Sequence, residues 1–236
     1  MWRLFLLSSI AVVAWAQPVF VYSEFARIDT KTGDVIAPET PREILSPAVV
    51  RNGFTSFQVV VQAPTEAKWW LFVGQNPENA FNLTVYKESA AGLERVDLPI
   101  QSEGTQVYWM DVWTDADAPV RRVKLEPELN LHDDWVIYPM EARVVDAEVP
   151  GGRSEAAGTP VAAMRGFLCG LPASDSMAVE GISIPSFRLR NARQDLALAA
   201  AAPKDELKNL LGDCAAPPPP DPEWYLRIRD YLFRLR

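Results

Sequence analysis

The chain has 236 residues, a formal net charge of −8 and one histidine, His132. An acidic chain is repelled by nucleic acid and by anionic membrane surfaces, so neither is an expected partner. One histidine is too few for the common zinc hydrolase sites, and we expect no metal centre of that kind. The length suits one large domain, or one domain with a small appendage.

The first residues have the pattern of a cleavable secretory signal. A basic start leads into the uncharged run Leu4–Val13, and the small residues Ala14 and Ala16 precede Gln17. This run is about half the length of a membrane-spanning helix, which needs roughly 20 apolar residues. We therefore predict that residues 1–16 are a signal peptide cleaved after Ala16. The mature protein is then secreted or periplasmic, without a membrane span.

Residues 17–150 are rich in short stretches typical of β-strands, separated by Pro, Gly, Asn and Asp. The expected strands are Pro18–Phe25, Phe54–Gln62, Trp69–Val73, Asn82–Lys87, Gln106–Thr114, Arg121–Leu125 and Trp135–Val145. Many short strands at this spacing predict a mainly β domain, built as an antiparallel β-sandwich.

Residues 151–214 differ from the strand-rich part and predict a mixed loop and helix extension. Residues 191–202 and 204–211 have high helix propensity, and Gly212 is placed to cap the second helix. The chain has two cysteines, Cys169 and Cys214. In an oxidising compartment we expect them to form a disulfide.

A proline-rich strut over residues 215–222 precedes a C-terminal amphipathic helix over residues 223–236. One apolar stripe of this helix consists of Trp224, Ile228, Tyr231 and Leu235. A second stripe on the opposite side indicates burial on more than one face. Two interpretations stay open: the helix packs back onto its own protein, or its main stripe binds a protein partner or a second copy of the chain.

No motif predicts a catalytic centre or a cofactor. The chain has no Walker A loop, no G-x-S-x-G and no G-x-G-x-x-G after a strand. The remaining route to an enzyme is a pair of carboxylates, and Asp115 with Asp117 is a weak candidate for calcium. The acidic candidates are Asp111, Asp115, Asp117, Glu126, Glu128, Asp133 and Asp134. We expect these side chains to be solvated, so we predict no catalytic residue, metal or cofactor.

The segment Gln106–Thr114 is the most suggestive for ligand binding. On a strand, Trp109, Asp111 and Trp113 share one face, while the residues between them share the other and form the core side. Aromatic rings beside a hydrogen-bond acceptor suit the apolar faces and hydroxyls of sugars. We predict that these three residues bind a ligand, with Trp69-Trp70 and Trp135 extending the surface. The alternative is a buried tryptophan cluster.

The segment Arg51-Asn52-Gly53-Phe54-Thr55-Ser56-Phe57-Gln58 resembles the R-N-E-x-x-S-F-Q strand of a group of secreted proteins. These proteins carry a β-sandwich ahead of a barrel related to glycoside hydrolase family 123. Gly53 replaces the usual Glu, and the resemblance extends at most over Pro18–Pro150. The residues after Pro150 are too few for a barrel. The resemblance therefore implies a sandwich without the catalytic barrel, and no catalytic residue carries over.

Together these features predict an exported, non-catalytic binding protein that contacts a glycan or a cell-envelope polysaccharide through an aromatic surface. One alternative is an envelope assembly or scaffold protein that engages its partner through the C-terminal helix. The other is an unrecognised hydrolase that uses loop carboxylates.

Overall fold

The computed structural model describes residues 17–24, 26–36, 46–149, 192–212, 227–228 and 231–232. The predicted signal peptide, the cysteines Cys169 and Cys214, the strut 215–222 and the helix residues Trp224 and Leu235 lie outside these ranges. In the described part of the chain, no helix has the length and apolar character needed to cross a membrane.

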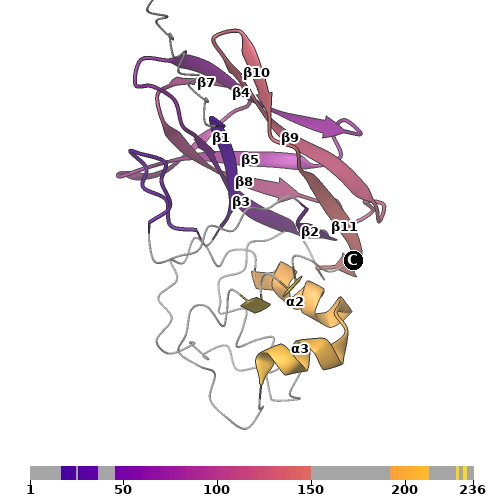
Figure 1. Cartoon of the computed structure of the whole chain (residues 1–236). Coiled ribbons are helices and arrows are strands. Elements are labelled where there is room, and N and C mark those ends of the chain that lie inside the picture. Colours follow the sequence, from indigo (N-terminus) through magenta and orange to yellow (C-terminus); the bar gives the residue numbers. More distant parts are fainter. Residues whose placement is uncertain are drawn as a thin grey trace, which may run out of the picture.

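Two β-sheets pack face to face (Figure 1). The first sheet contains, in spatial order, β1 (Val19–Ser23), β3 (Phe54–Val61), β8 (Gln106–Trp113), β5 (Asn82–Ser89) and β6 (Gly92–Val96). The second contains β2 (Ala48–Arg51), β11 (Glu141–Glu148), β9 (Arg122–Leu131), β4 (Lys68–Asn76) and β7 (Ile100–Glu103), and β10 (Asp134–Ile137) pairs with β9. The mainly β fold is confirmed. One pair differs from the expected antiparallel pattern, because β2 and β11 are parallel.

The strands missed by the sequence are short and lie next to long ones. Among the described strands, β7 pairs with β4 alone, and β6 pairs with β5 alone through a tight hairpin that brings Ser89 opposite Gly92. Edge strands expose much of their surface, so they need little of the apolar alternation that identifies a strand. In β6, the glycine and the two charged residues are exposed, and the two apolar residues, Leu93 and Val96, are only partly buried.

The core lies between the inner faces of the two sheets, and Trp69 and Tyr108 are among its largest fully buried side chains. The two rings meet edge to face, with centroids 6.2 Å apart. The Trp69 Nε1 donates a hydrogen bond of 2.8 Å to the Gly104 carbonyl. Gly104 has a φ of 62°, and an added Cβ would lie 3.2 Å from the Thr65 carbonyl oxygen. A glycine therefore brings the acceptor close to the indole without strain.

Tyr108 gives the core a measurable pH dependence. Burial raises the pKa of Tyr108 from 10.0 to about 12, and the nearby Ser102 side chain offsets part of the rise. Among the described residues, its hydroxyl has no hydrogen bond of good geometry. Below pH 10 the phenol is neutral in both states. As the pH rises further, the unfolded chain loses the proton first, so the stability that the neutral phenol contributes is lost towards pH 12.

We expect Tyr108→Phe to change the free energy of unfolding little at neutral pH, because the buried hydroxyl lacks a good partner. In alkaline solution the variant should become more stable than the wild type by up to about 2–3 kcal/mol. Urea unfolding between about pH 8 and about pH 12 measures the difference. A constant difference across this range would contradict the prediction.

The β9–β10 hairpin turns through His132 and Asp133, with φ of 54° and 65°. Two consecutive positive φ values match a type I′ turn, which strongly prefers glycine at its second position. Asp133→Gly should raise the free energy of unfolding by about 0.5–1 kcal/mol, because the left-handed conformation is strained in a residue with a Cβ. The control is Asp117→Gly, since Asp117 is in a turn but does not have a positive φ. Stabilisation of both variants alike would contradict this reason.

The two predicted helices near the C-terminus are confirmed as α2 (Ala192–Ala201) and α3 (Lys204–Leu211). Pro203 separates them. Gly212, with a φ of 74°, ends α3, and its N–H donates to the Lys208 carbonyl at 3.0 Å. Figure 1 shows both helices at one end of the sandwich, with α2 near β2 and β11.

The described residues of the C-terminal helix are helical and contact the chain itself. Ile228 and Leu232 are fully buried, and the Tyr231 hydroxyl donates a 2.9 Å hydrogen bond to Glu206 of α3. This arrangement matches the interpretation in which the helix packs back onto its own protein. Ile228 is therefore buried within the chain, whereas Tyr231 is only partly buried, and docking of a partner through this helix stays a prediction.

Candidate ligand-binding surface

The predicted alternation along β8 is confirmed, but the predicted exposure is wrong. Tyr108, Met110 and Val112 belong to the core, so Trp109, Asp111 and Trp113 lie on the outer face of the first sheet. Trp109 is 2% exposed and Asp111 is 0% exposed, while Trp113 is half-buried. The ligand site predicted at Trp109, Asp111 and Trp113 is therefore not an open surface.

On the outer face of β3 and β8, the buried side chains have partners within the chain. The Trp109 Nε1 donates to the Glu88 carboxylate at 2.8 Å, and the Ser56 hydroxyl donates to Asp111 at 2.7 Å. Trp113 stacks on Phe54 with ring centroids 4.3 Å apart. A small apolar cluster also forms on this face, containing Ala26, Ile28, Val60 and Val107. A two-residue alternation in the sequence cannot distinguish such a covered face from a solvated one.

The residues of the R-N-G-x-x-S-F-Q segment hold strands together. The Gln58 side-chain amide donates to the carbonyls of Ser23 and Ala26, at 2.8 and 2.7 Å. Asn52 donates through its side chain to the Val149 carbonyl at 2.8 Å. These contacts join β3 and its turn to distant parts of the chain, so the segment has a structural role in this sandwich.

An exposed aromatic surface is present on the second sheet instead. Trp70 is 39% exposed and Trp135 is 55% exposed, and Phe72 is half-buried between them. The Trp70 and Phe72 rings stack with centroids 6.2 Å apart and planes at 26°. The Phe72 and Trp135 centroids are 5.4 Å apart, at 41°. We call Trp70, Phe72 and Trp135 the aromatic row.

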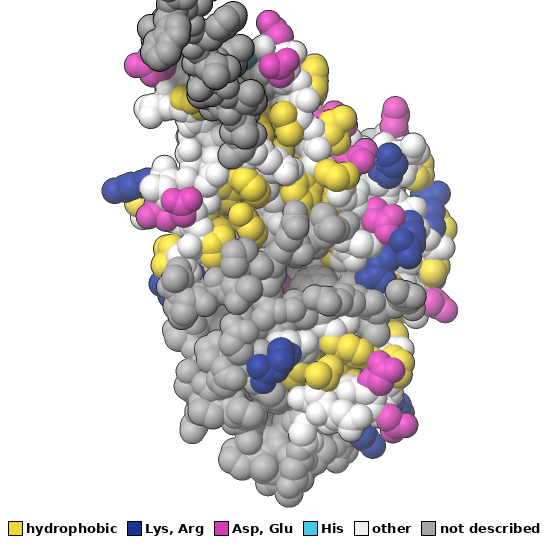
Figure 2. All heavy atoms as spheres, viewed as in Figure 1, with side chains coloured by type: hydrophobic (Ala, Val, Ile, Leu, Met, Phe, Trp, Pro, Cys, Tyr) yellow, Lys and Arg dark blue, Asp and Glu magenta, His cyan; other side chains and the backbone are white. Residues whose placement is uncertain are grey.

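The adjacent tryptophans of β4 have opposite environments. Trp69 points into the core at 1% exposure, so the expectation that it extends the ligand surface is wrong, whereas Trp70 points outward as expected. Successive side chains of a strand point to opposite faces. The tryptophan on each face is therefore fixed by the register of β4 in the sandwich. Figure 2 shows hydrophobic side chains at the surface near β9 and β10, in the upper part of the view.

Polar side chains of β9 lie between the aromatic residues of β4 and β10. Asn130 is the register partner of both Trp70 and Trp135. One row further along, Glu128 is the partner of Phe72 and of the exposed Ile137. The outer face thus has apolar side chains on two strands and hydrogen-bonding side chains on the strand between them.

Gly74 makes room for the Glu128 carboxylate. A Cβ at this position would run into Oε1 of Glu128, so the carboxylate lies over the bare backbone of β4. Glu126, the next outward residue of β9, is 3.6 Å from the Lys124 ammonium. Among the described residues, neither an ion pair nor a side-chain hydrogen bond involves Glu128, Asn130, Trp70 or Trp135. These groups are therefore available to a ligand.

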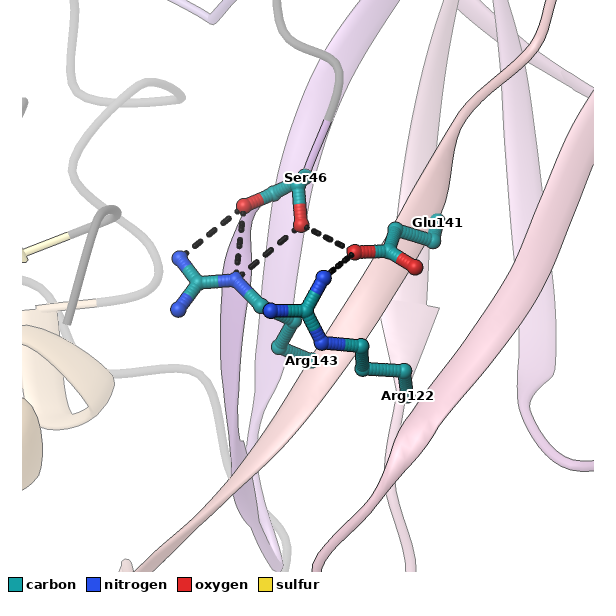
Figure 3. Close-up of polar contacts among 4 residues, drawn as sticks. All are labelled: Ser46, Arg122, Glu141 and Arg143. Carbon is teal, nitrogen blue, oxygen red and sulfur yellow. Dashed lines mark hydrogen bonds and ion pairs between the residues drawn. The ribbon is translucent and has the colours of Figure 1, made fainter. Parts of the chain in front are cut away.

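A second polar cluster lies where β2 begins beside β11 (Figure 3). The Arg143 guanidinium donates to the Ser46 carbonyl and hydroxyl at 3.0–3.1 Å. The Ser46 hydroxyl donates to Glu141 at 2.9 Å, and Arg122 donates to the same carboxylate oxygen at 2.6 Å. Arg143 is buried, Glu141 is partly buried and Arg122 is exposed, and charge-assisted hydrogen bonds of this kind join neighbouring strands. We assign this cluster a structural role.

The loop carboxylates do not converge. Asp115, Asp117, Asp133 and Asp134 are all exposed. Within the described ranges, no group of three or more His, Cys, Asp or Glu side chains is arranged to hold a metal ion. The calcium candidate at Asp115 and Asp117 thus has no third His, Cys, Asp or Glu side chain grouped with it among the described residues.

Comparison with known proteins gives only distant likenesses. No family model matches the chain, and no curated protein matches its sequence. Its structure weakly and partly resembles a family 123 glycoside hydrolase from Clostridium perfringens (TM-score 0.40, 7% identity), over 56% of this chain and 28% of that one. This agrees with the weak, partial resemblance in the sequence.

Two other solved structures show lower similarity. A GH5 xyloglucanase from Bacteroides ovatus has a TM-score of 0.29 and 10% identity, over 48% of this chain and 20% of that one. WR4, an MSP family member from C. elegans, has a TM-score of 0.25 and 7% identity, over 42% of this chain and 92% of that one. The chain thus spans about a quarter or less of the two hydrolases that it matches.

Proposed function

We propose that this chain is an exported, non-catalytic protein that binds a glycan, such as a cell-envelope polysaccharide, through the aromatic row. The observation that supports the proposal is that the exposed Trp70 and Trp135 both contact the Phe72 ring, with Asn130 and Glu128 on the strand between β4 and β10. Sugar rings offer apolar C–H faces that stack on aromatic rings, and hydroxyls that need hydrogen-bond partners at the same time.

A polar strand between aromatic strands favours a sugar over a protein partner. A protein interface would bury Glu128 and Asn130 in its dry centre, and each unpaired group there would lower the affinity. A sugar hydroxyl donates to the carboxylate and leaves it partly in water. The chain's net charge of −8 also opposes binding to an anionic lipid surface.

The test is a titration of the purified chain with a panel of soluble neutral, acidic and amino polysaccharides. We expect slower migration in gels that contain a bound polysaccharide, and a blue shift of tryptophan emission as Trp70 and Trp135 leave water. A folded protein that responds to no member of the panel would contradict the proposal. Export is tested by expressing the chain with residues 1–16 and sequencing the N-terminus of the processed protein. We expect the processed protein to begin at Gln17.

A further inference from the structure

The arrangement of the aromatic row specifies a class of glycan, an inference that rests on the proposed function. Trp70 and Trp135 are register partners of the same residue, Asn130, on opposite sides of β9. Their backbones are therefore two interstrand spacings apart, about 10 Å. Phe72 contacts both tryptophan rings: the Trp70–Phe72 contact runs along β4, and the Phe72–Trp135 contact crosses β9.

This geometry suits an extended chain rather than a coiled one. A β-1,4-linked pyranose chain is ribbon-like, and it presents equivalent ring faces at a repeat similar to the backbone separation of Trp70 and Trp135. An α-linked chain coils and needs a curved groove. Trp70, Trp135 and Ile137 are exposed on this sheet face, so the interior of a long polysaccharide can lie across it as well as its end.

Charge selects further among extended chains. Glu128 lies in the middle of the surface, over Gly74 and opposite Phe72, and no described cation neutralises it. The basic residue on the outer face of β4, Lys68, has Glu103 as its register partner. A polyanionic glycan would bring carboxylates or sulfates towards Glu128 and be repelled.

We propose that the aromatic row binds the interior of an uncharged, extended, β-1,4-linked polysaccharide that crosses β4, β9 and β10. In this proposal the Asn130 amide donates hydrogen bonds to sugar hydroxyls and accepts them, the Glu128 carboxylate accepts them, and Glu128 is the residue that discriminates against acidic chains.

Two polymers with the same backbone test the charge selection. The full chain is titrated with hydroxyethyl cellulose and with carboxymethyl cellulose at low salt, by affinity gel electrophoresis. We expect the carboxymethyl form to bind at least about fivefold more weakly. The difference between the two affinities should decrease as added salt screens the repulsion. Soluble starch, an α-linked polymer, is the linkage control and should bind more weakly than hydroxyethyl cellulose.

Glu128→Gln keeps the shape of the side chain and removes its charge. It should improve carboxymethyl cellulose binding by about fivefold and change hydroxyethyl cellulose binding by less than about twofold. Glu94→Gln is the matched control, because it removes one exposed carboxylate from β6 of the other sheet. It should leave the ratio of the two affinities unchanged.

The outcomes separate this inference from the proposed function. Equal binding of the two celluloses, or equal effects of Glu128→Gln and Glu94→Gln, would overturn the role of Glu128. Starch binding as tight as that of hydroxyethyl cellulose would overturn the preference for an extended chain. In both cases glycan binding through the aromatic row would stand. Failure to bind any polysaccharide would instead overturn both.

Discussion

Trp69→Ala is expected to lower the free energy of unfolding by about 4 kcal/mol, whereas Trp70→Ala should lower it by less than about 1 kcal/mol. The two residues are adjacent in β4, but one is fully buried and the other is 39% exposed. Removing the Trp69 indole leaves a cavity in the core and leaves the Gly104 carbonyl without its 2.8 Å donor. Removing the Trp70 indole removes only surface contacts with Phe72.

Urea unfolding followed by circular dichroism measures both values, because tryptophan fluorescence changes with the substitutions themselves. Trp69→Phe is the milder companion variant. It keeps most of the core volume but loses the indole N–H, so it should lie between the wild type and Trp69→Ala. Similar losses for Trp69→Ala and Trp70→Ala would show that the register of β4 is wrong.

The second large effect is on binding. Trp70→Ala and Trp135→Ala should each weaken binding to a polysaccharide that the wild type recognises by at least about tenfold, and the double variant by about 100-fold or more. Each indole is a large apolar surface that stacks on a sugar ring, and the two are far enough apart to contact different rings. Isothermal titration calorimetry with a soluble polysaccharide measures the change.

Val120→Ala is the matched control, since Val120 is 55% exposed and lies outside the aromatic row. It should bind like the wild type. Thermal unfolding of each variant shows that a loss of affinity is not a loss of fold. Unchanged binding by the double variant would rule out the aromatic row as the site, even if the chain binds glycans elsewhere.

Local signals in the sequence were enough for most of the fold. The alternation Phe57, Val59, Val61 located β3, and the helix signals at Pro203 and Gly212 bounded α3. The short strands β2, β6 and β7 were not predicted, because each depends on a longer neighbour for its hydrogen bonds. The parallel pairing of β2 with β11 joins residues about a hundred positions apart, which no local pattern indicates.

The candidate surface, like the fold, was predictable from the sequence only in part. The sequence indicated that Trp109, Asp111 and Trp113 share a face, and that Trp69-Trp70 and Trp135 could extend an aromatic surface. It did not indicate that β4 would place Trp70 and Phe72 beside Trp135, since this needs β9 between β4 and β10. It also did not indicate that the outer face of β8 is covered while the outer face of β4 is open.

The sequence by itself determined the mainly β class, most strand positions, the two helices and the alternation of side chains within each strand. These follow from backbone sterics, glycine and proline signals and apolar periodicity, all of which act over a few residues. The tertiary structure alone decided which of two alternating faces is buried and which tryptophans meet. Burial depends on what packs against a face, and the packing partners come from strands distant in the chain.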